Sequence, residues 1–199
     1  MKRSVLMATM TLVPALASAQ APKSEPVKPL TEAQQIASAV LPLPQEFRDN
    51  ARVLGYKAGG KALVPIRDGS GSFTCLATEP NAAFHAACYH NSMEPFMARG
   101  RSLRAEGVKD PQVDTVRFAE VKSGKIKMPA QPAALYQLFG GSYDATTNAL
   151  TGARSLFVAY MPGATAATTG MTEKPAPAGV PWIMFPGTPK AHIMLEPKM

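Results

Sequence analysis

Cysteine and histidine are scarce in this chain, which has two Cys and three His. The haem-attachment motif Cys-x-x-Cys-His, the Walker phosphate loop and the glycine-rich dinucleotide fingerprint are all missing. These absences exclude a c-type cytochrome, a P-loop nucleotide hydrolase and a Rossmann-type dinucleotide enzyme, and we predict no cofactor. The serines of DGSGS, residues 68–72, lack the strand-turn-helix context of a nucleophile elbow. A hydrolase would need a scattered Ser, an acid and a histidine such as His192.

Long apolar runs are missing after the first residues of the chain. Lys2 and Arg3 precede an apolar run over residues 5–16, and the small residues Ala17-Ser18-Ala19 follow. This pattern predicts a signal peptide over residues 1–19 with cleavage after Ala19, and its apolar run is short for a bilayer span. The residue directly after that site is not a Cys, so nothing there supports a lipid anchor. We therefore predict a soluble periplasmic or secreted protein without a membrane span.

Positive charge exceeds negative charge only moderately, with 21 Lys and Arg against 14 Asp and Glu and a formal net charge of +7. Lys2 and Arg3 account for part of this excess and would leave with the signal peptide. The remaining basic residues are scattered, apart from Arg99, Arg101 and Arg104, and they do not alternate with aromatic residues. This distribution argues against nucleic acid as a partner.

The predicted mature chain begins with a proline-rich segment and continues as one domain. Residues 20–30 carry three prolines among polar residues, which is typical of an extended tether. Thr31 and Gln34 have the spacing of a capping box, and this predicts a helix over about 32–40. We assign residues 31–199 to a single α+β domain, since this length suits one hydrophobic core.

Short strands follow the first helix. Residues 52–57 and 62–66 predict a hairpin around a Gly-Gly turn, and the DGSG turn at 68–71 precedes a strand at 72–78. A further strand is predicted at about 84–89. Because these strands are consecutive and their connections are short, we expect an antiparallel sheet.

The second half of the chain mixes helical and extended patterns. Residues 92–106 predict a helix that ends at Gly107, and residues 131–139 predict another helix. Residues 116–121 fit either a hairpin or a short helix. Residues 162–179 contain almost no large apolar side chain and predict a mobile loop. Further strands are predicted at 154–161, 181–185 and 191–195. The predicted fold is an antiparallel sheet or partly open β-barrel with two to three helices packed on it.

The two cysteines lie on strands that we expect to be neighbours. If residues 79–81 form the turn, Cys75 and Cys88 oppose each other, and directly opposed residues are within disulfide range. An oxidising compartment favours the disulfide over a reactive thiol or a metal pair. Side chains alternate along a strand, so His85 and His90 should face opposite sides of the sheet. This argues against a Cys2His2 zinc site.

A narrower metal hypothesis uses His90, Met93 and Met97. In a helix starting near residue 92 the two methionines lie one turn apart, and thioether and imidazole ligands suit copper. Met93, Phe96, Met97 and Leu103 also recur at helical spacing, which is the pattern of a helix face packed on a core. Core packing is therefore the preferred interpretation, and a periplasmic copper-binding protein is the first alternative function.

Arg104 falls close to this apolar stripe, where its charge needs a partner or a route to solvent. Together with Arg101 and His90 it could line a site for an anion. The preferred hypothesis is a non-enzymatic domain that binds a small anionic ligand or a protein partner through His90, Arg101 and Arg104. The hydrolase is the second alternative, so the sequence leaves open whether the protein is an enzyme.

Overall fold

The computed structural model describes residues 26–175, 177 and 179–196. The predicted signal peptide (1–19) and residues 20–25 of the predicted tether lie outside this part of the chain. Residues 26–30 are attached to the domain, since Val27 is buried and its backbone exchanges hydrogen bonds with Asn81 and Ala82 over 2.8 and 2.7 Å. Among the described residues, no helix has the length and apolar character that crossing a membrane requires.

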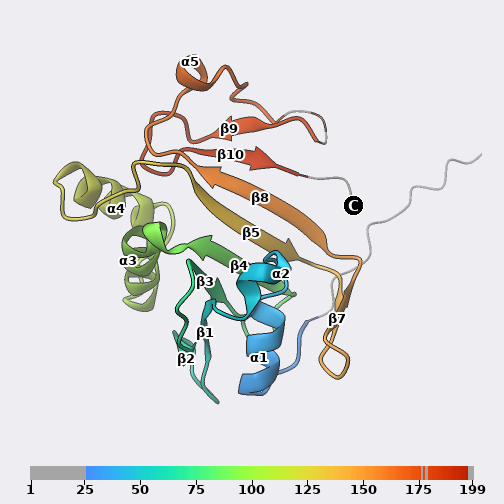
Figure 1. Ribbon diagram of the computed structural model, residues 1–199. Helices are drawn as coiled ribbons and strands as arrows, with labels where there is room; N and C mark the ends of the chain where they lie inside the picture. Colours follow the sequence, from blue (N-terminus) through green and yellow to red (C-terminus); the bar gives the residue numbers. More distant parts are fainter. Residues whose placement is uncertain (1–25, 176, 178, 197–199) are drawn as a thin grey trace, which may run out of the picture.

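The centre of the fold is an eight-stranded sheet with the order β2-β1-β3-β4-β5-β8-β10-β9 (Figure 1). The strands are β1 (Arg52–Tyr56), β2 (Leu63–Arg67), β3 (Phe73–Leu76), β4 (His85–His90), β5 (Ala133–Phe139), β8 (Arg154–Tyr160), β9 (Trp182–Met184) and β10 (His192–Leu195), with β6 (Ser142–Asp144) and β7 (Ala149–Thr151) forming a separate hairpin. The sheet is open and does not close into a barrel. The predicted α+β class is confirmed, in its open-sheet form.

One strand pair departs from the expected antiparallel pattern, because β1 and β3 run parallel. The chain leaves β2 at the sheet edge and passes around the start of β1 to reach its other side. A Cβ on Gly69 would lie 2.3 Å from the backbone nitrogen of Arg52, and the Gly71 nitrogen donates to the carbonyl oxygen of Asn50 over 2.7 Å. The glycines of the predicted turn therefore allow this close crossing.

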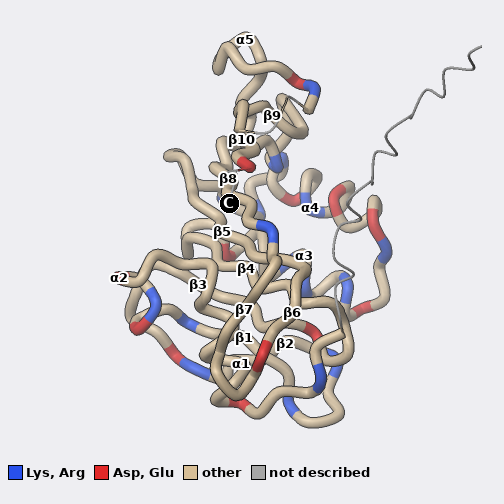
Figure 2. The backbone as a smooth tube through the Cα atoms, turned by 90° about the vertical axis from the view of Figure 1, so that its right-hand side faces the viewer, with Lys and Arg blue, Asp and Glu red and all other residues tan. Residues whose placement is uncertain are grey.

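Helices pack on both faces of the sheet. These helices are α1 (Glu32–Ala39), α2 (Gln45–Arg48), α3 (Glu94–Ala105) and α4 (Gln112–Lys122), with a 3-10 turn over Asn91–Met93. The short helix α5 (Ala166–Thr169) lies at the outer end of the fold, beyond β9 (Figure 1). In Figure 2 the sheet lies between α2 on the left and α3 with α4 on the right. The core of the first face includes Ala39, Cys75 and Cys88, and the core of the second includes Tyr89 and Phe96.

Several predicted elements differ in the structure. The predicted helix at 131–139 is wrong, since Ala133–Phe139 form strand β5. Both faces of this strand are mainly apolar, and it fills the centre of the sheet between β4 and β8. Residues 116–121, for which the sequence left a hairpin or a short helix open, belong to helix α4, so the helical alternative holds. The predicted loop 162–179 contains α5, which Thr165 caps. The first helix and its capping box from Thr31 to Gln34 are confirmed.

A disulfide joins the neighbouring strands β3 and β4. Cys75 lies directly opposite Cys88 in the register, and both are fully buried against α1. The predicted pairing is therefore confirmed. The cross-link holds the register that decides which side chains of β4 face α1 and which face α3.

The disulfide should contribute substantially to stability. Replacing both cysteines in Cys75→Ala/Cys88→Ala should lower the free energy of unfolding by about 3 kcal/mol, because the unfolded chain regains the freedom of the closed loop. Urea denaturation followed by circular dichroism measures this change. Wild-type protein unfolded with a reductant provides the control and should show a similar loss. Equal stability of the variant and the oxidised wild type would contradict the prediction.

Candidate functional site

A hydrogen-bonded cluster ties helix α3 to strand β4. The Tyr89 hydroxyl donates to the carboxylate of Glu94, and Arg101 donates to the Tyr89 oxygen over 2.7 Å and to Glu94 over 2.8 Å. Arg52 adds a longer contact to Glu94 at 3.4 Å. Burial raises the pKa of Tyr89, with the charge of Arg101 opposing, so the hydroxyl stays protonated and can donate. The cluster fixes the position of the Arg101 side chain relative to α3.

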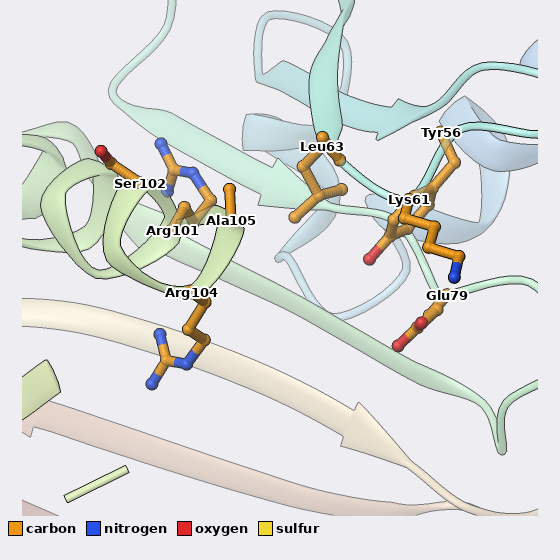
Figure 3. A pocket seen from close by; sticks show the side chains of 9 residues that line it. Tyr56, Lys61, Leu63, Glu79, Arg101, Ser102, Arg104 and Ala105 are labelled. Atoms are coloured by element: carbon orange, nitrogen blue, oxygen red, sulfur yellow. The ribbon is translucent and has the colours of Figure 1, made fainter. Parts of the chain in front are cut away.

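A hollow of about 620 Å³ lies between α3 and the β1–β2 hairpin. We call it the basic groove. Figure 3 shows residues of α3 on one side and residues of the hairpin and of the segment after β3 on the other. The side chains that matter for its chemistry are Tyr56, Lys61, Leu63, Glu79, Arg101 and Arg104. Three of these carry positive charge and one carries negative charge.

The cations of the basic groove differ in how firmly they are held. Arg101 is engaged with Glu94, and Arg104 pairs with Asp110 over 3.1 Å in a contact whose two side chains are 50% and 63% exposed. Such an exposed pair contributes about 1 kcal/mol or less, so Arg104 can exchange its partner at low cost. Within the described part of the chain, Lys61 has no carboxylate within ion-pair distance.

Tyr56 supplies a neutral donor in the same groove. Burial, and to a lesser degree the charge of Glu79, raises the pKa of Tyr56, so its hydroxyl stays protonated at neutral pH. In Figure 3 the side chains of Tyr56, Lys61 and Glu79 gather on the hairpin side, while Arg101 and Arg104 extend from α3 in different directions. An anion in this groove would meet the Tyr56 hydroxyl and the Lys61 ammonium on the hairpin side, and it would meet Arg104 once that side chain turns away from Asp110.

His90 lies on the opposite face of the sheet from the basic groove. It is two residues from Cys88 on β4, and its ring meets the edge of Phe73, with ring centroids 5.7 Å apart. Its Nδ1 also accepts a hydrogen bond from the backbone nitrogen of Ser92 and caps the turn before α3. The structure thus brings Arg101 and Arg104 to one groove and leaves His90 outside it.

The residues of the copper hypothesis have contacts with the protein itself. Met93 is fully buried, and Met97 packs against the same core cluster as Phe96. The His90 ring lies on the other face of the sheet, against Phe73, and its Nδ1 caps the turn that leads into α3. The described residues hold no group of three or more His, Cys, Asp or Glu placed for a metal ion. The copper site stays a prediction from the sequence alone.

A second polar cluster joins helix α4 to the segment before β10. Arg117 is 4% exposed, donates to the carboxylate of Asp114, and lies over the ring of Phe96 at 3.9 Å. Lys190 donates to the other oxygen of Asp114 over 2.8 Å. Burial alone would raise the pKa of Asp114, but hydrogen bonds from Lys190 and Arg117 outweigh it and lower this pKa. The cluster holds the end of the sheet against α4.

His192 lies beside this cluster, on strand β10. It is 5% exposed, and its ring packs against Tyr160 and Phe185 with centroids 5.1 and 5.8 Å away. Burial lowers the pKa of His192, the carbonyl of Lys190 opposes the shift, and the charge of Lys190 adds to it. Burial also raises the pKa of Tyr160 to about 12. His192 is therefore a neutral core histidine at pH 7.

Sequence reasoning did not single out Tyr56, Lys61 or Glu79. Lys61 follows two glycines and Glu79 precedes a proline, so both have the local pattern of turn residues. Their approach to α3 depends on the order of β2, β1 and β3 in the sheet, which no local pattern records. Comparison with protein families, curated proteins and solved structures finds no match to the chain.

The lowered pKa of His192 predicts a pH effect on stability. The unfolded imidazole titrates near its ordinary value of about 6.5, and the folded one titrates lower, so the unfolded state binds more protons below that pH. The stability that the protein gains from burying the neutral His192 ring is complete above about pH 7. It is lost as the pH falls through 6.5 toward the folded pKa, because protons then bind the unfolded state preferentially. His192→Gln should therefore lose less stability than the wild type between pH 7 and pH 5.

Urea denaturation at both pH values measures this difference, and His85→Gln serves as the matched control because His85 is exposed. The control should keep the pH dependence of the wild type. An unchanged pH dependence in His192→Gln would show that the buried imidazole is not its source.

Proposed function

We propose that the protein is an exported, non-enzymatic binding domain that takes a small anionic ligand into the basic groove. The observation that carries this proposal is that Lys61, Arg101 and Arg104 all line one hollow whose single acidic lining residue is Glu79. A groove whose charged lining residues are mainly cationic raises the local concentration of anions and favours their binding.

The arrangement gives each group a distinct role. Lys61 is a point charge on a flexible stem, and Arg104 can release Asp110 and offer a planar pair of donors to a carboxylate or phosphate. Arg101 is held in place by Glu94 and Tyr89, and the carboxylate of Glu94 offsets much of its charge, so Lys61 and Arg104 are the main cations for a ligand. Tyr56 can donate a neutral hydrogen bond. These are binding groups, and the proposal includes no chemical step.

Export is the second part of the proposal. The leader-like pattern of residues 1–19 supports it, because a basic start, a short apolar run and small residues at the end are typical of a signal peptide. The buried disulfide between Cys75 and Cys88 also supports it, because such bonds persist in oxidising compartments. Either the periplasm or the medium fits these features.

Anion binding can be tested with citrate, phosphate and butanoate as probes. Titrations followed by the Nε–Hε NMR signals of arginine should move the signals of Arg101 and Arg104, since these report on the groove directly. Lys61→Gln and Arg104→Gln should each weaken binding about fivefold, the effect of one lost contact of about 1 kcal/mol.

Lys127→Gln is the matched control, because Lys127 is an exposed lysine outside the basic groove and the substitution removes the same charge. It should bind the anions as the wild type does. The proposal is wrong if none of the three probes binds. It is also wrong if Lys127→Gln weakens binding as much as Lys61→Gln does.

A further inference from the structure

The basic groove continues along the sheet as a longer channel. A hollow of about 340 Å³ shares Tyr56, Leu63 and Glu79 with the basic groove. A further hollow of about 450 Å³ shares Ala83 and His85 with the second one. The three hollows therefore follow one another along the face of the sheet that carries α3.

The floor of this extension is a row of directly paired residues. Leu76 on β3 pairs with Ala87 on β4, Ala87 pairs with Gln137 on β5, and Gln137 pairs with Leu156 on β8. Neighbouring strands lie about 4.8 Å apart, so the row spans about 14 Å, and β1 and β2 add about 10 Å at the end where Leu63 lies. Three of the four residues in the row are apolar.

The cations and most of the apolar side chains occupy different parts of the channel. The cations lie in the basic groove, between α3 and the β1–β2 hairpin, whereas alanine and leucine make up most of the lining of the middle hollow. Its polar lining residues are Tyr56, Glu79 and His85, and the negative charge of Glu79 disfavours an anionic head there. The one polar floor residue, Gln137, is already hydrogen-bonded to His85, with 3.0 Å between the Gln137 oxygen and His85 Nε2. A ligand that fills the whole channel must therefore carry its charge at one end and an apolar body behind it.

We propose that the ligand is an amphipathic organic anion, a carboxylate with an unbranched apolar chain, whose head lies at Lys61 and Arg104 and whose chain follows the row from Leu76 to Leu156. This inference rests on the proposed function, because it takes the basic groove as the site of the head group. The charge of the head complements the cations, and the chain removes the apolar floor from water.

A chain-length series tests the inference. Isothermal titration calorimetry with butanoate and decanoate, both below the concentration at which decanoate aggregates, should show decanoate binding at least tenfold more tightly. A fully buried methylene strengthens binding about fourfold, and a groove open on one side captures only part of that effect for each added methylene. Lys61→Gln should weaken the binding of both ligands by a similar factor.

A substitution in the channel tests the site of the apolar chain independently of the site of the carboxylate head. Ala83 is exposed and lines the hollows of about 340 and 450 Å³, so Ala83→Gln places a neutral polar side chain in the path of the ligand. This substitution should weaken the binding of decanoate at least threefold and leave the binding of butanoate unchanged. Ala149→Gln on β7, which is also exposed and lies outside the channel, should change neither.

The outcomes distinguish the two proposals. If butanoate binds through Lys61 but decanoate binds no more tightly, the apolar chain has no site and this inference is overturned while anion binding stands. If neither carboxylate binds, and citrate and phosphate also fail, both proposals are overturned. A gain with chain length that Ala149→Gln abolishes as strongly as Ala83→Gln would place the chain elsewhere and also overturn the inference.

Discussion

The pairing of β3 with β4, locked by the buried disulfide, is the constraint on which the rest of the structure depends. With Cys75 opposite Cys88, the side chains of β4 are divided between the two faces of the sheet. Cys88 and His90 face the core under α1, and Ala87 and Tyr89 face the side of α3. A shift of one residue in this register would reverse every assignment.

Tyr89 shows how this register reaches the candidate site. Because Tyr89 faces α3, its hydroxyl meets Glu94 and Arg101 and holds the helix at a fixed position over the sheet. Two residues earlier, Ala87 has the smallest apolar side chain, and its place on the same face leaves room beside the helix. The basic groove and its extension along the sheet therefore follow from the same alternation that places His90 elsewhere.

Local patterns predicted the features that depend on neighbouring residues. The capping box from Thr31 to Gln34 is satisfied within a single turn, and the disulfide follows from two strands that are adjacent in sequence. Strand β5 was wrongly predicted as a helix, because its alanine, leucine and glutamine residues favour helices and only its place between β4 and β8 makes it extended. The parallel pairing of β1 with β3 likewise depends on strand order.

The charged side chains of the two polar clusters and of the basic groove differ in how easily they can exchange one partner for another. Arg117 is almost fully buried, stacked on Phe96 and bound to Asp114, so removing its partner would leave a buried charge at a cost of about 3–5 kcal/mol. Arg104 and Asp110 are half exposed, so water compensates either one when they separate. Only a cation of the second kind can give up its internal partner for an external anion. Arg104 and Lys61, and not the buried Arg117, therefore have the physical freedom that binding a ligand requires.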